Sequence, residues 1–280
     1  MQSRSLTPTE KKMVAIVVPI SMRAELTPDE SVSLRHLRHY LDRYDKYLVA
    51  PQSLEFSLPD FKVEKFADKF FGSAKAHAEL QLSEGFYRRF QQYQYILLYH
   101  LDALALSDQL MEWCRMDYDY IGAPWIRCKD TPEVSRSRVG NSGFTLIKIE
   151  SFLKVFNSDR YSVDPEEYWI RAYGAQPWYV RAAALPKKYL KRIRYFNGAR
   201  WEMRRWTSRT DGRENGDYFW SDEAIRYYDQ FRIPSVDVGL RFAFEVAPRL
   251  CFEMNHHRLP FGCHAWVRYD RAFWEPYLLK

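Results

Sequence analysis

The chain has 280 residues, of which 46% are hydrophobic and 28% are charged, with a formal net charge of +6. This length and composition allow a large buried core and exclude global disorder. No apolar run approaches the roughly 20 residues of a transmembrane helix, and the N-terminal residues lack the apolar segment of a signal peptide.

Apolar periodicity in the N-terminal half predicts alternating strands and helices. We expect a flexible tail at residues 1–12 and one folded domain over 13–280. In chain order, the expected elements are a strand at Met13–Ile20, a helix at Asp29–Tyr44 capped by Asp29, strands at Lys46–Pro51 and Lys62–Phe66, a helix at Ser73–Phe90, a strand at Tyr95–Tyr99, a helix at Gln109–Cys114 and a strand at Tyr118–Trp125. The β-α-β order favours an α/β fold with a largely parallel sheet.

The C-terminal half has weaker periodicity. Its expected segments are a polar loop at Ile126–Val139, a glycine turn and strand at Val139–Ile149, a helix at Glu150–Phe156, an irregular basic region at 157–215, a helix at Ser221–Phe231 and short strands at Phe242–Glu245 and Leu250–Glu253. No internal repeat is present in this sequence.

Asp102 is the first candidate for a functional residue, because it lies where the apolar strand Tyr95–Tyr99 is expected to end, three residues after Tyr99. Ligands of open α/β sheets bind beyond the carboxyl ends of the strands. A carboxylate at this position is a hard oxygen ligand for Mg²⁺ or Mn²⁺, which would bridge a diphosphate. The alternative is that Asp102 caps a helix that begins near Leu104. His100 is either a second ligand or a hydrogen-bonded core histidine.

The segment GNSGF forms the second candidate. Gly140 and Gly143 permit a tight turn and a close approach between the backbone and a ligand. Asn141 and Ser142 can form hydrogen bonds with sugar hydroxyls. The alternative is a plain hairpin turn.

Two further segments carry titratable side chains. GDYFWSDEAI places Asp217, Asp222 and Glu223 where a loop enters a helix, so that one of them can act as a general base on an acceptor hydroxyl. The alternative role of these acids is to cap the helix and complement its dipole. LPFGCHAW presents His264 on a turn, where it can bind a metal or a diphosphate, or can pack in the core.

Several common site signatures are missing from the sequence. Neither a Walker P-loop nor a GxGxxG motif follows the first strand, which argues against P-loop enzymes, kinases and standard dinucleotide-binding proteins. The four cysteines have no CxxC spacing, so structural zinc is not expected. They favour reduced thiols in a cytosolic protein.

The excess positive charge is concentrated in one stretch. Its basic residues, which have Glu202 as their only acidic neighbour, are Lys187, Lys188, Lys191, Arg192, Arg194, Arg200, Arg204 and Arg205. Such a patch favours phosphate-bearing partners, namely nucleic acid, an anionic membrane or a pyrophosphate-linked substrate. The alternative is a solvated basic face.

In this order, the segments VAIVVP, YILLYHLDA, GNSGFTL, FWSDEA and PFGCHAW resemble glycosyltransferases of the GT-A type. More closely, the chain looks like a bacterial family of glycosyltransferase-like domains of undefined function, found with polysaccharide genes. The resemblance covers nearly the whole chain. It implies a single α/β domain with a Rossmann-like mixed sheet, mostly parallel and flanked by helices.

The resemblance also implies roles for individual residues. A nucleotide-diphosphate sugar, with a UDP-sugar favoured, would bind near Pro19 and Ser21, and Mn²⁺ or Mg²⁺ would bind Asp102 and His264. His100 stands where such enzymes have the first acid of Asp-x-Asp. The residues expected beside the donor sugar are Gly140, Asn141, Ser142 and Gly143. Asp217 would be the catalytic base of an inverting reaction, with Asp222 and Glu223 as rivals.

The expected acceptor is a glycan or a lipid-diphosphate-linked sugar of surface polysaccharide, such as lipopolysaccharide. We expect a cytoplasmic protein that contacts the anionic inner face of the membrane through residues 187–206, with no nucleic-acid partner. Two alternatives remain open. The basic aromatic stretch could instead bind nucleic acid, with rings that stack on bases, or the altered Asp-x-Asp could mark a catalytically silent scaffold of a polysaccharide assembly complex.

Overall fold

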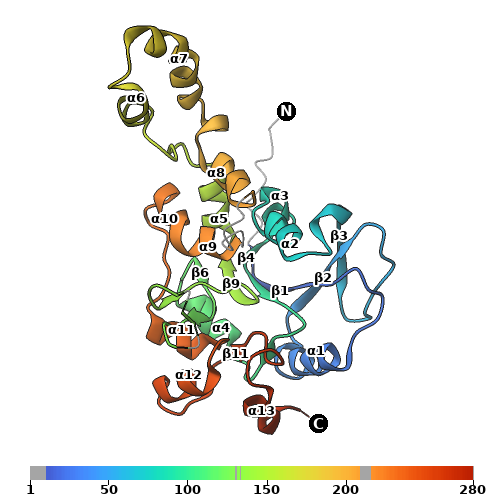
Figure 1. Cartoon of the computed structure of the whole chain (residues 1–280). Helices are drawn as coiled ribbons and strands as arrows, with labels where there is room; N and C mark the ends of the chain where they lie inside the picture. The colour runs from blue at the N-terminus through green and yellow to red at the C-terminus, as the bar shows by residue number, and fades with distance from the viewer. Residues whose placement is uncertain (1–10, 130, 133, 209–215, 280) are drawn as a thin grey trace, which may run out of the picture.

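The computed structural model describes residues 11–129, 131–132, 134–208 and 216–279. A six-stranded sheet with the strand order β3-β2-β1-β4-β9-β6 lies at its centre (Figure 1). The strands span Lys12–Pro19 (β1), Asp45–Pro51 (β2), Lys62–Phe66 (β3), Tyr93–Tyr99 (β4), Tyr120–Ile121 (β6) and Phe144–Lys148 (β9). The first four strands are mutually parallel, whereas β9 is antiparallel to β4 and β6. The predicted mixed, mostly parallel α/β sheet flanked by helices is therefore confirmed.

Both faces of the sheet are buried, which explains why its strands are continuously apolar. Side chains alternate between the two faces of a strand. In β1, Ala15 and Val17 join one apolar cluster, whereas Val14, Ile16 and Val18 join another on the opposite face. A parallel strand covered on both sides needs apolar residues at every position.

Five helices cover these faces. They span Pro28–Leu41 (α1), Ala74–Gln81 (α2), Glu84–Arg88 (α3), Leu110–Arg115 (α4) and Ile149–Phe156 (α5). Leu80, Phe86 and Phe152 of α2, α3 and α5 pack on one face. Leu37 and Leu110 of α1 and α4 pack on the other.

Two helix predictions need correction. The N-cap of α1 is Thr27, whose hydroxyl accepts a hydrogen bond from the Glu30 amide while the Glu30 carboxylate accepts one from the Thr27 amide. Asp29 lies inside the first turn and pairs with Arg271. The single helix expected at Ser73–Phe90 is instead two helices, α2 and α3. The first ends at Gln81, whose carbonyl accepts a hydrogen bond from the Tyr87 hydroxyl.

Most of the described part of the basic region is helical rather than irregular. It forms α6 (Pro165–Tyr173), α7 (Trp178–Lys191) and α8 (Ala199–Trp206), and α6 and α7 project from the body as a helical hairpin (Figure 1). Asp164 caps α6, and Pro165 occupies its first position. The polar loop expected at Ile126–Val139 is partly ordered by β8 (Arg138–Val139), which pairs with β7 (Pro124–Trp125).

The C-terminal part adds short helices and a small three-stranded sheet. The helices span Gly216–Tyr218 (α9), Ala224–Tyr227 (α10), Val236–Phe242 (α11), Pro248–Met254 (α12) and Arg271–Trp274 (α13), and the strands are Ala243–Phe244 (β10), Gly262–Cys263 (β11) and Leu104–Ala105 (β5). The helix expected at Ser221–Phe231 runs instead from Gly216 to Tyr227, with a π-helical segment at Phe219–Glu223. The strand expected at Leu250–Glu253 is part of α12, which begins at Pro248. A short apolar run does not distinguish a strand from a helix.

Two bulk predictions also bear on the fold. All four cysteines are free thiols. Over the described ranges, none of the helices combines the length and apolarity that crossing a membrane requires.

Candidate functional site

The ends of two neighbouring parallel strands place the first predicted site residues together. β1 ends at Pro19 and its partner β4 ends at Tyr99, so Ser21 and Asp102 emerge at the same edge of the sheet. There Pro19, Ser21, His100 and Asp102 line a cavity of about 550 Å³, which we call the Pro19 cavity. Asp102 does not cap a helix, because β5 begins at Leu104.

A second cavity adjoins the first. It has a volume of about 480 Å³, and we call it the Ser142 cavity. Its polar lining consists mainly of His77, Gln81, His100, Asn141, Ser142, Asp217, Glu245 and His264. His77 and His100 line both cavities and so form a shared wall between them.

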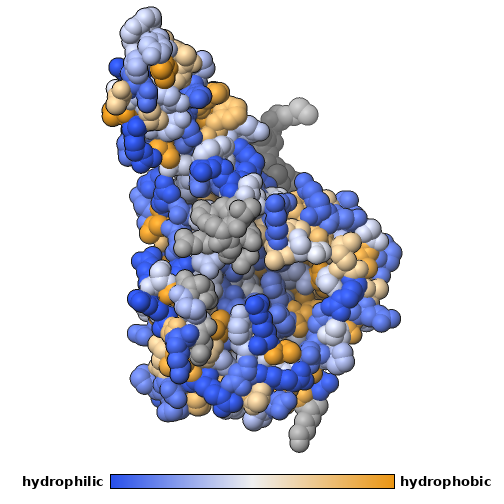
Figure 2. Space-filling view, viewed as in Figure 1, coloured by the Kyte–Doolittle hydropathy of each residue, from blue (hydrophilic) through white to orange (hydrophobic). Residues whose placement is uncertain are grey.

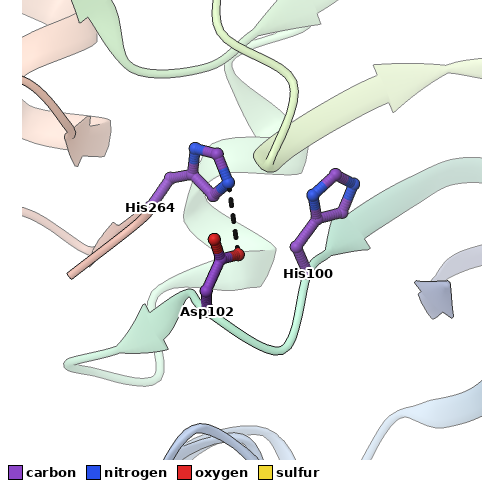
Figure 3. Close-up of side chains that lie close together, drawn as sticks. All are labelled: His100, Asp102 and His264. Atoms are coloured by element: carbon purple, nitrogen blue, oxygen red, sulfur yellow. Dashed lines mark ion pairs between the residues drawn. The ribbon is translucent and has the colours of Figure 1, made fainter. Parts of the chain in front are cut away.

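His100, Asp102 and His264 converge at this wall (Figure 3). One ligand atom from each lies within 4.8 Å of the other two, and His264 Nε2 is 3.2 Å from Asp102 Oδ1. Sheet pairing explains the approach of residues so distant in sequence. Cys263 of β11 pairs with Leu104 of β5, which sets His264 beside the turn that carries Asp102.

Glu245 holds the other side of His264. Its Oε1 lies 3.0 Å from His264 Nδ1 and accepts a hydrogen bond of 2.8 Å from Asn141 Nδ2. Glu245 directly follows β10, the parallel partner of β11, so the two residues enter the cavity side by side. The Glu245 side chain is buried, and its Oε2 has no hydrogen-bond partner among the described residues.

The electrostatics of this pairing favour a charged imidazole. Burial alone would lower the pKa of His264, but its contacts with the carboxylates of Asp102 and Glu245 raise it to about 10. Partial burial of Asp102 acts to raise the pKa of its carboxyl, and the adjacent His264 outweighs this effect and lowers it below its usual range. Without a metal, His264 is therefore an imidazolium between two carboxylates.

The wall between the cavities is uncharged by contrast. His77 Nε2 lies 3.0 Å from His100 Nε2 and 3.0 Å from Gln81 Nε2. Burial is the main cause that lowers the pKa of His77 to about 4, and burial beside His77 and His264 lowers the pKa of His100 well below its ordinary value. Both rings are neutral at pH 7, so each keeps a nitrogen lone pair.

Asp217 also lines the Ser142 cavity. The Ser142 hydroxyl and amide both donate hydrogen bonds to its carboxylate, and Gln81 donates to the Ser142 hydroxyl. Burial raises the pKa of Asp217 to about 6, with Glu245 adding to the shift and the Ser142 hydrogen bond opposing it. A carboxyl in this range can exchange protons near neutral pH.

The two glycines of GNSGF serve close packing. A Cβ atom at Gly143 would come within 2.0 Å of the His264 ring, and one at Gly140 within 2.0 Å of the Trp125 ring. Asn141, Ser142 and Gly143 line the Ser142 cavity, whereas Gly140 is buried behind it and accepts the Tyr120 hydroxyl. Of the four residues expected beside the donor sugar, three therefore line the Ser142 cavity and Gly140 does not.

The two rivals of Asp217 lie away from this cavity. Asp222 lines a separate surface cavity, where its Oδ1 is 3.1 Å from Arg138 Nε. Glu223 pairs with Arg226 in the following turn. These contacts give Asp222 and Glu223 local structural roles, so among the three predicted acids the cavity holds Asp217.

Three site residues were not predicted from the sequence. Glu245 is a carboxylate at the end of a short strand, as Asp102 is a carboxylate just beyond the end of β4, and that signal could have found it. His77 and Gln81 are four residues apart on α2 and face the cavity together. A polar pair at this spacing occurs on most surface helices, so it carries no comparable signal.

Solved structures of glycosyltransferases align with the chain at very low sequence identity and with low TM-scores. The glycosyltransferase GlyE of Streptococcus pneumoniae TIGR4 aligns with 96% of this chain at 10% identity and a TM-score of 0.45, and this chain spans 61% of that one. Mouse xyloside xylosyltransferase 1 aligns with 91% of the chain, and 97% of its own, at 12% identity and a TM-score of 0.43. The bifunctional glycosyltransferase WbbM gives 93% and 47% coverage, 13% identity and a TM-score of 0.39.

At the sequence level, no curated protein is detectably similar to the chain. A family model described as "Protein of unknown function (DUF5672)" matches residues 60–264. This range includes the turn at His100 and Asp102 and the GNSGF segment, and it ends at His264. The chain therefore belongs to the DUF5672 family.

Proposed function

We propose that the chain is a glycosyltransferase that moves a sugar from a nucleotide-diphosphate donor, with a UDP-sugar favoured, to a hydroxyl of a glycan or lipid-linked acceptor. The observation that carries the proposal is the position of His100, Asp102 and His264 where the two cavities meet. The nucleoside would occupy the Pro19 cavity and the sugar the Ser142 cavity. The diphosphate would then lie beside the three converging side chains.

The donor set fits a divalent cation. Two imidazoles and one carboxylate converge, and this mixed set suits Mn²⁺ better than Mg²⁺, which prefers oxygen ligands. Glu245 accepts a hydrogen bond from Nδ1–H of His264 and thereby directs Nε2 toward Asp102, as carboxylates behind metal-bound histidines do. When bound, the cation would supply Lewis-acid stabilisation of the diphosphate leaving group.

Asp217 is the proposed base. Because the pKa of Asp217 is about 6, the residue is mostly ionised above neutral pH and can accept the proton of an acceptor hydroxyl. The hydroxyl oxygen then forms a bond to the anomeric carbon as the bond between that carbon and the diphosphate oxygen breaks. Attack from the face opposite the diphosphate inverts the anomeric configuration. Ser142 orients the carboxylate through two hydrogen bonds.

Polar groups around the Ser142 cavity would recognise the donor sugar. The unpartnered Oε2 of Glu245 can accept a hydrogen bond from a sugar hydroxyl, which would remove the cost of an unsatisfied buried carboxylate oxygen. Asn141 and Ser142, which line the same cavity, supply further polar atoms.

We place the reaction in surface polysaccharide biosynthesis in the cytoplasm, on the basis of the sequence resemblance. The free thiols, three of which are buried, suit a reducing compartment.

The test is a thermal-shift screen of UDP-, GDP-, CMP- and dTDP-sugars with and without Mn²⁺. We expect a UDP-sugar to raise the melting temperature only when Mn²⁺ is present. The Asp102→Asn variant should keep the fold and lose this stabilisation, whereas the matched Asp237→Asn variant, which changes an exposed acid, should retain it. Absence of stabilisation by every nucleotide sugar would contradict the proposal.

A further inference from the structure

The outer face of α7 exposes large apolar side chains on the projecting hairpin. Trp178 is 79% exposed, Tyr179 60% and Tyr189 59%, and Leu185, Leu190 and Ile193 are also exposed. Figure 2 shows hydrophobic residues on this projection, interspersed with hydrophilic ones. Apolar side chains gathered on one exposed element mark an interaction surface more often than scattered ones do.

Helical geometry places these side chains on a single stripe. At 3.6 residues per turn, positions 178, 185 and 189 lie almost directly above one another, and 179 and 190 lie beside them. The one buried residue of α7, Ala184, points to the side where Lys188 pairs with Glu166 of α6 at 2.8 Å. The packed side and the apolar stripe are therefore different faces of the same helix.

Positive charge surrounds the stripe. Residues 174–201 contain seven lysines and arginines and no acidic residue. Arg181 and Arg192 follow one border of the stripe and Lys187 the other. Over the described ranges, Arg181, Lys187 and Arg194 take part in no ion pair. An amphipathic helix with Trp, Tyr and Leu on one face and basic residues at its borders has the composition of a helix that lies in a membrane interface.

We infer that the outer face of α7, defined by Trp178, Tyr179, Leu185, Tyr189 and Leu190, binds the surface of an anionic lipid bilayer. The apolar side chains enter the headgroup region, and the bordering basic side chains contact lipid phosphates. This inference is independent of the proposed glycosyl transfer, because it rests on exposure and charge outside both cavities.

Charge and shape favour a bilayer over the other occupants. A second copy of the chain would bring two strongly basic segments together, and like charges at an interface oppose association. A single-stranded nucleic acid would use the rings but leave Leu185, Leu190 and Ile193 exposed to water. A bilayer can bury the apolar stripe and also pair its lipid phosphates with the basic residues at the borders.

The membrane-binding surface inferred here differs from the one that the sequence predicted at residues 187–206. Trp206 is buried, and Trp201 lies beneath Lys191 and Arg205, whose cationic groups are 4.1 and 4.6 Å from its ring centre. These rings are packed and cannot enter a membrane. The strongest apolar anchor, Trp178, precedes the expected range.

The experiment is co-sedimentation of the full chain with vesicles of phosphatidylcholine alone or with about 30% phosphatidylglycerol. We expect binding to the anionic vesicles and little to the neutral ones. Arg181→Gln with Lys187→Gln should weaken binding by about 25-fold, since each basic residue contributes about fivefold. Trp178→Ala with Tyr189→Ala should weaken it by about tenfold or more.

Matched controls distinguish binding through this surface from non-specific binding of exposed apolar or charged residues to vesicles. Ile225→Ala removes an exposed apolar side chain, and Arg115→Gln with Lys129→Gln removes two exposed charges, all outside residues 174–201. These variants should bind as the parent does, with unchanged circular dichroism in all cases. Any of three results would overturn the inference. The α7 variants could bind vesicles as tightly as the parent does, or the chain could bind an oligonucleotide but no vesicles. The chain could also self-associate and lose this association on Trp178→Ala.

Discussion

The Nδ1 atom of His264 lies 3.0 Å from Oε1 of Glu245, while Nε2 of the same ring lies 3.2 Å from Oδ1 of Asp102. One imidazole thus joins a buried carboxylate to a half-exposed one. The buried partner fixes the ring orientation, and the exposed partner belongs to the proposed metal site. Glu245 therefore acts on that site through His264, although it follows a different strand.

Replacing Glu245 with Gln should weaken metal binding without removing a ligand. The neutral amide no longer holds the Nδ1 proton of His264 strongly, so Nε2 becomes a poorer and less well oriented donor. Loss of such a partner reduces metal affinity by about 10- to 100-fold. Calorimetric titration with Mn²⁺ measures this, with the exposed Glu253→Gln as the control. Unchanged affinity in Glu245→Gln would show that His264 needs no orienting partner.

Gly143 tests how closely the GNSGF turn must approach His264. An alanine Cβ would lie within 2.0 Å of the imidazole, so Gly143→Ala must displace His264. We expect loss of Mn²⁺ binding by at least about tenfold and a lower free energy of unfolding, by about 1–3 kcal/mol. The readouts are calorimetric titration and urea unfolding.

The matched control for Gly143→Ala is Gly85→Ala. Gly85 lies in α3, and its added Cβ would meet nothing nearer than 3.5 Å. This substitution should stabilise the protein by about 0.5–1 kcal/mol, because alanine favours a helix over glycine, and should leave metal binding intact. If both variants keep full affinity for Mn²⁺, the contact between Gly143 and His264 does not matter for the site.

Sequence patterns were sufficient for the parallel part of the sheet. A strand buried on both faces is apolar at every position, and Met13–Ile20 and Tyr95–Tyr99 show this pattern without ambiguity. The hairpin of α6 and α7 was missed because α7 exposes its apolar stripe and carries Pro186 in its interior. Its pattern therefore does not resemble that of a helix packed on a core.

The site was predictable where one strand end or one turn delivers a residue, as for Asp102 and His264. Contacts that depend on pairing between distant short strands were not predictable. Glu245 reaches His264 only because the two-residue strands β10 and β11 run parallel, and the sequence does not show which short strands pair. The separation of Asp222 from Asp217 follows from helical spacing, since positions five apart lie about 140° apart around a helix axis, but the sequence does not show which of the two faces meets the cavity.

The charge of His264 should make the stability of the metal-free protein depend on pH. The pKa of His264 is raised to about 10 from 6.5, so its stabilising contribution is complete below pH 6.5 and is lost as the pH rises through about 10. We expect the free energy of unfolding to fall between pH 7 and pH 10 by up to about 4 kcal/mol more in the parent than in His264→Gln. Urea unfolding at several pH values measures both curves, and parallel curves would contradict the charged state assigned to His264.

Asp217→Asn should stop glycosyl transfer and make the protein more stable. The pKa of Asp217 is raised from 3.8 to about 6, so the parent loses stability as the pH rises through this range, and the uncharged amide avoids that loss. Above pH 7 we expect a gain of about 1–3 kcal/mol, because a two-unit shift corresponds to about 3 kcal/mol and a weakened Ser142 hydrogen bond offsets part of it. In the parent, the transfer rate should decline below pH about 6 as the carboxylate takes up a proton.

Urea unfolding, donor binding and a pH–rate profile separate these effects on stability and on transfer. The control is Asp222→Asn, which changes the acid paired with Arg138 outside the cavity and should keep donor binding and transfer. Full turnover by Asp217→Asn would place the base elsewhere, and loss of turnover in Asp222→Asn alone would return that role to the rival acid.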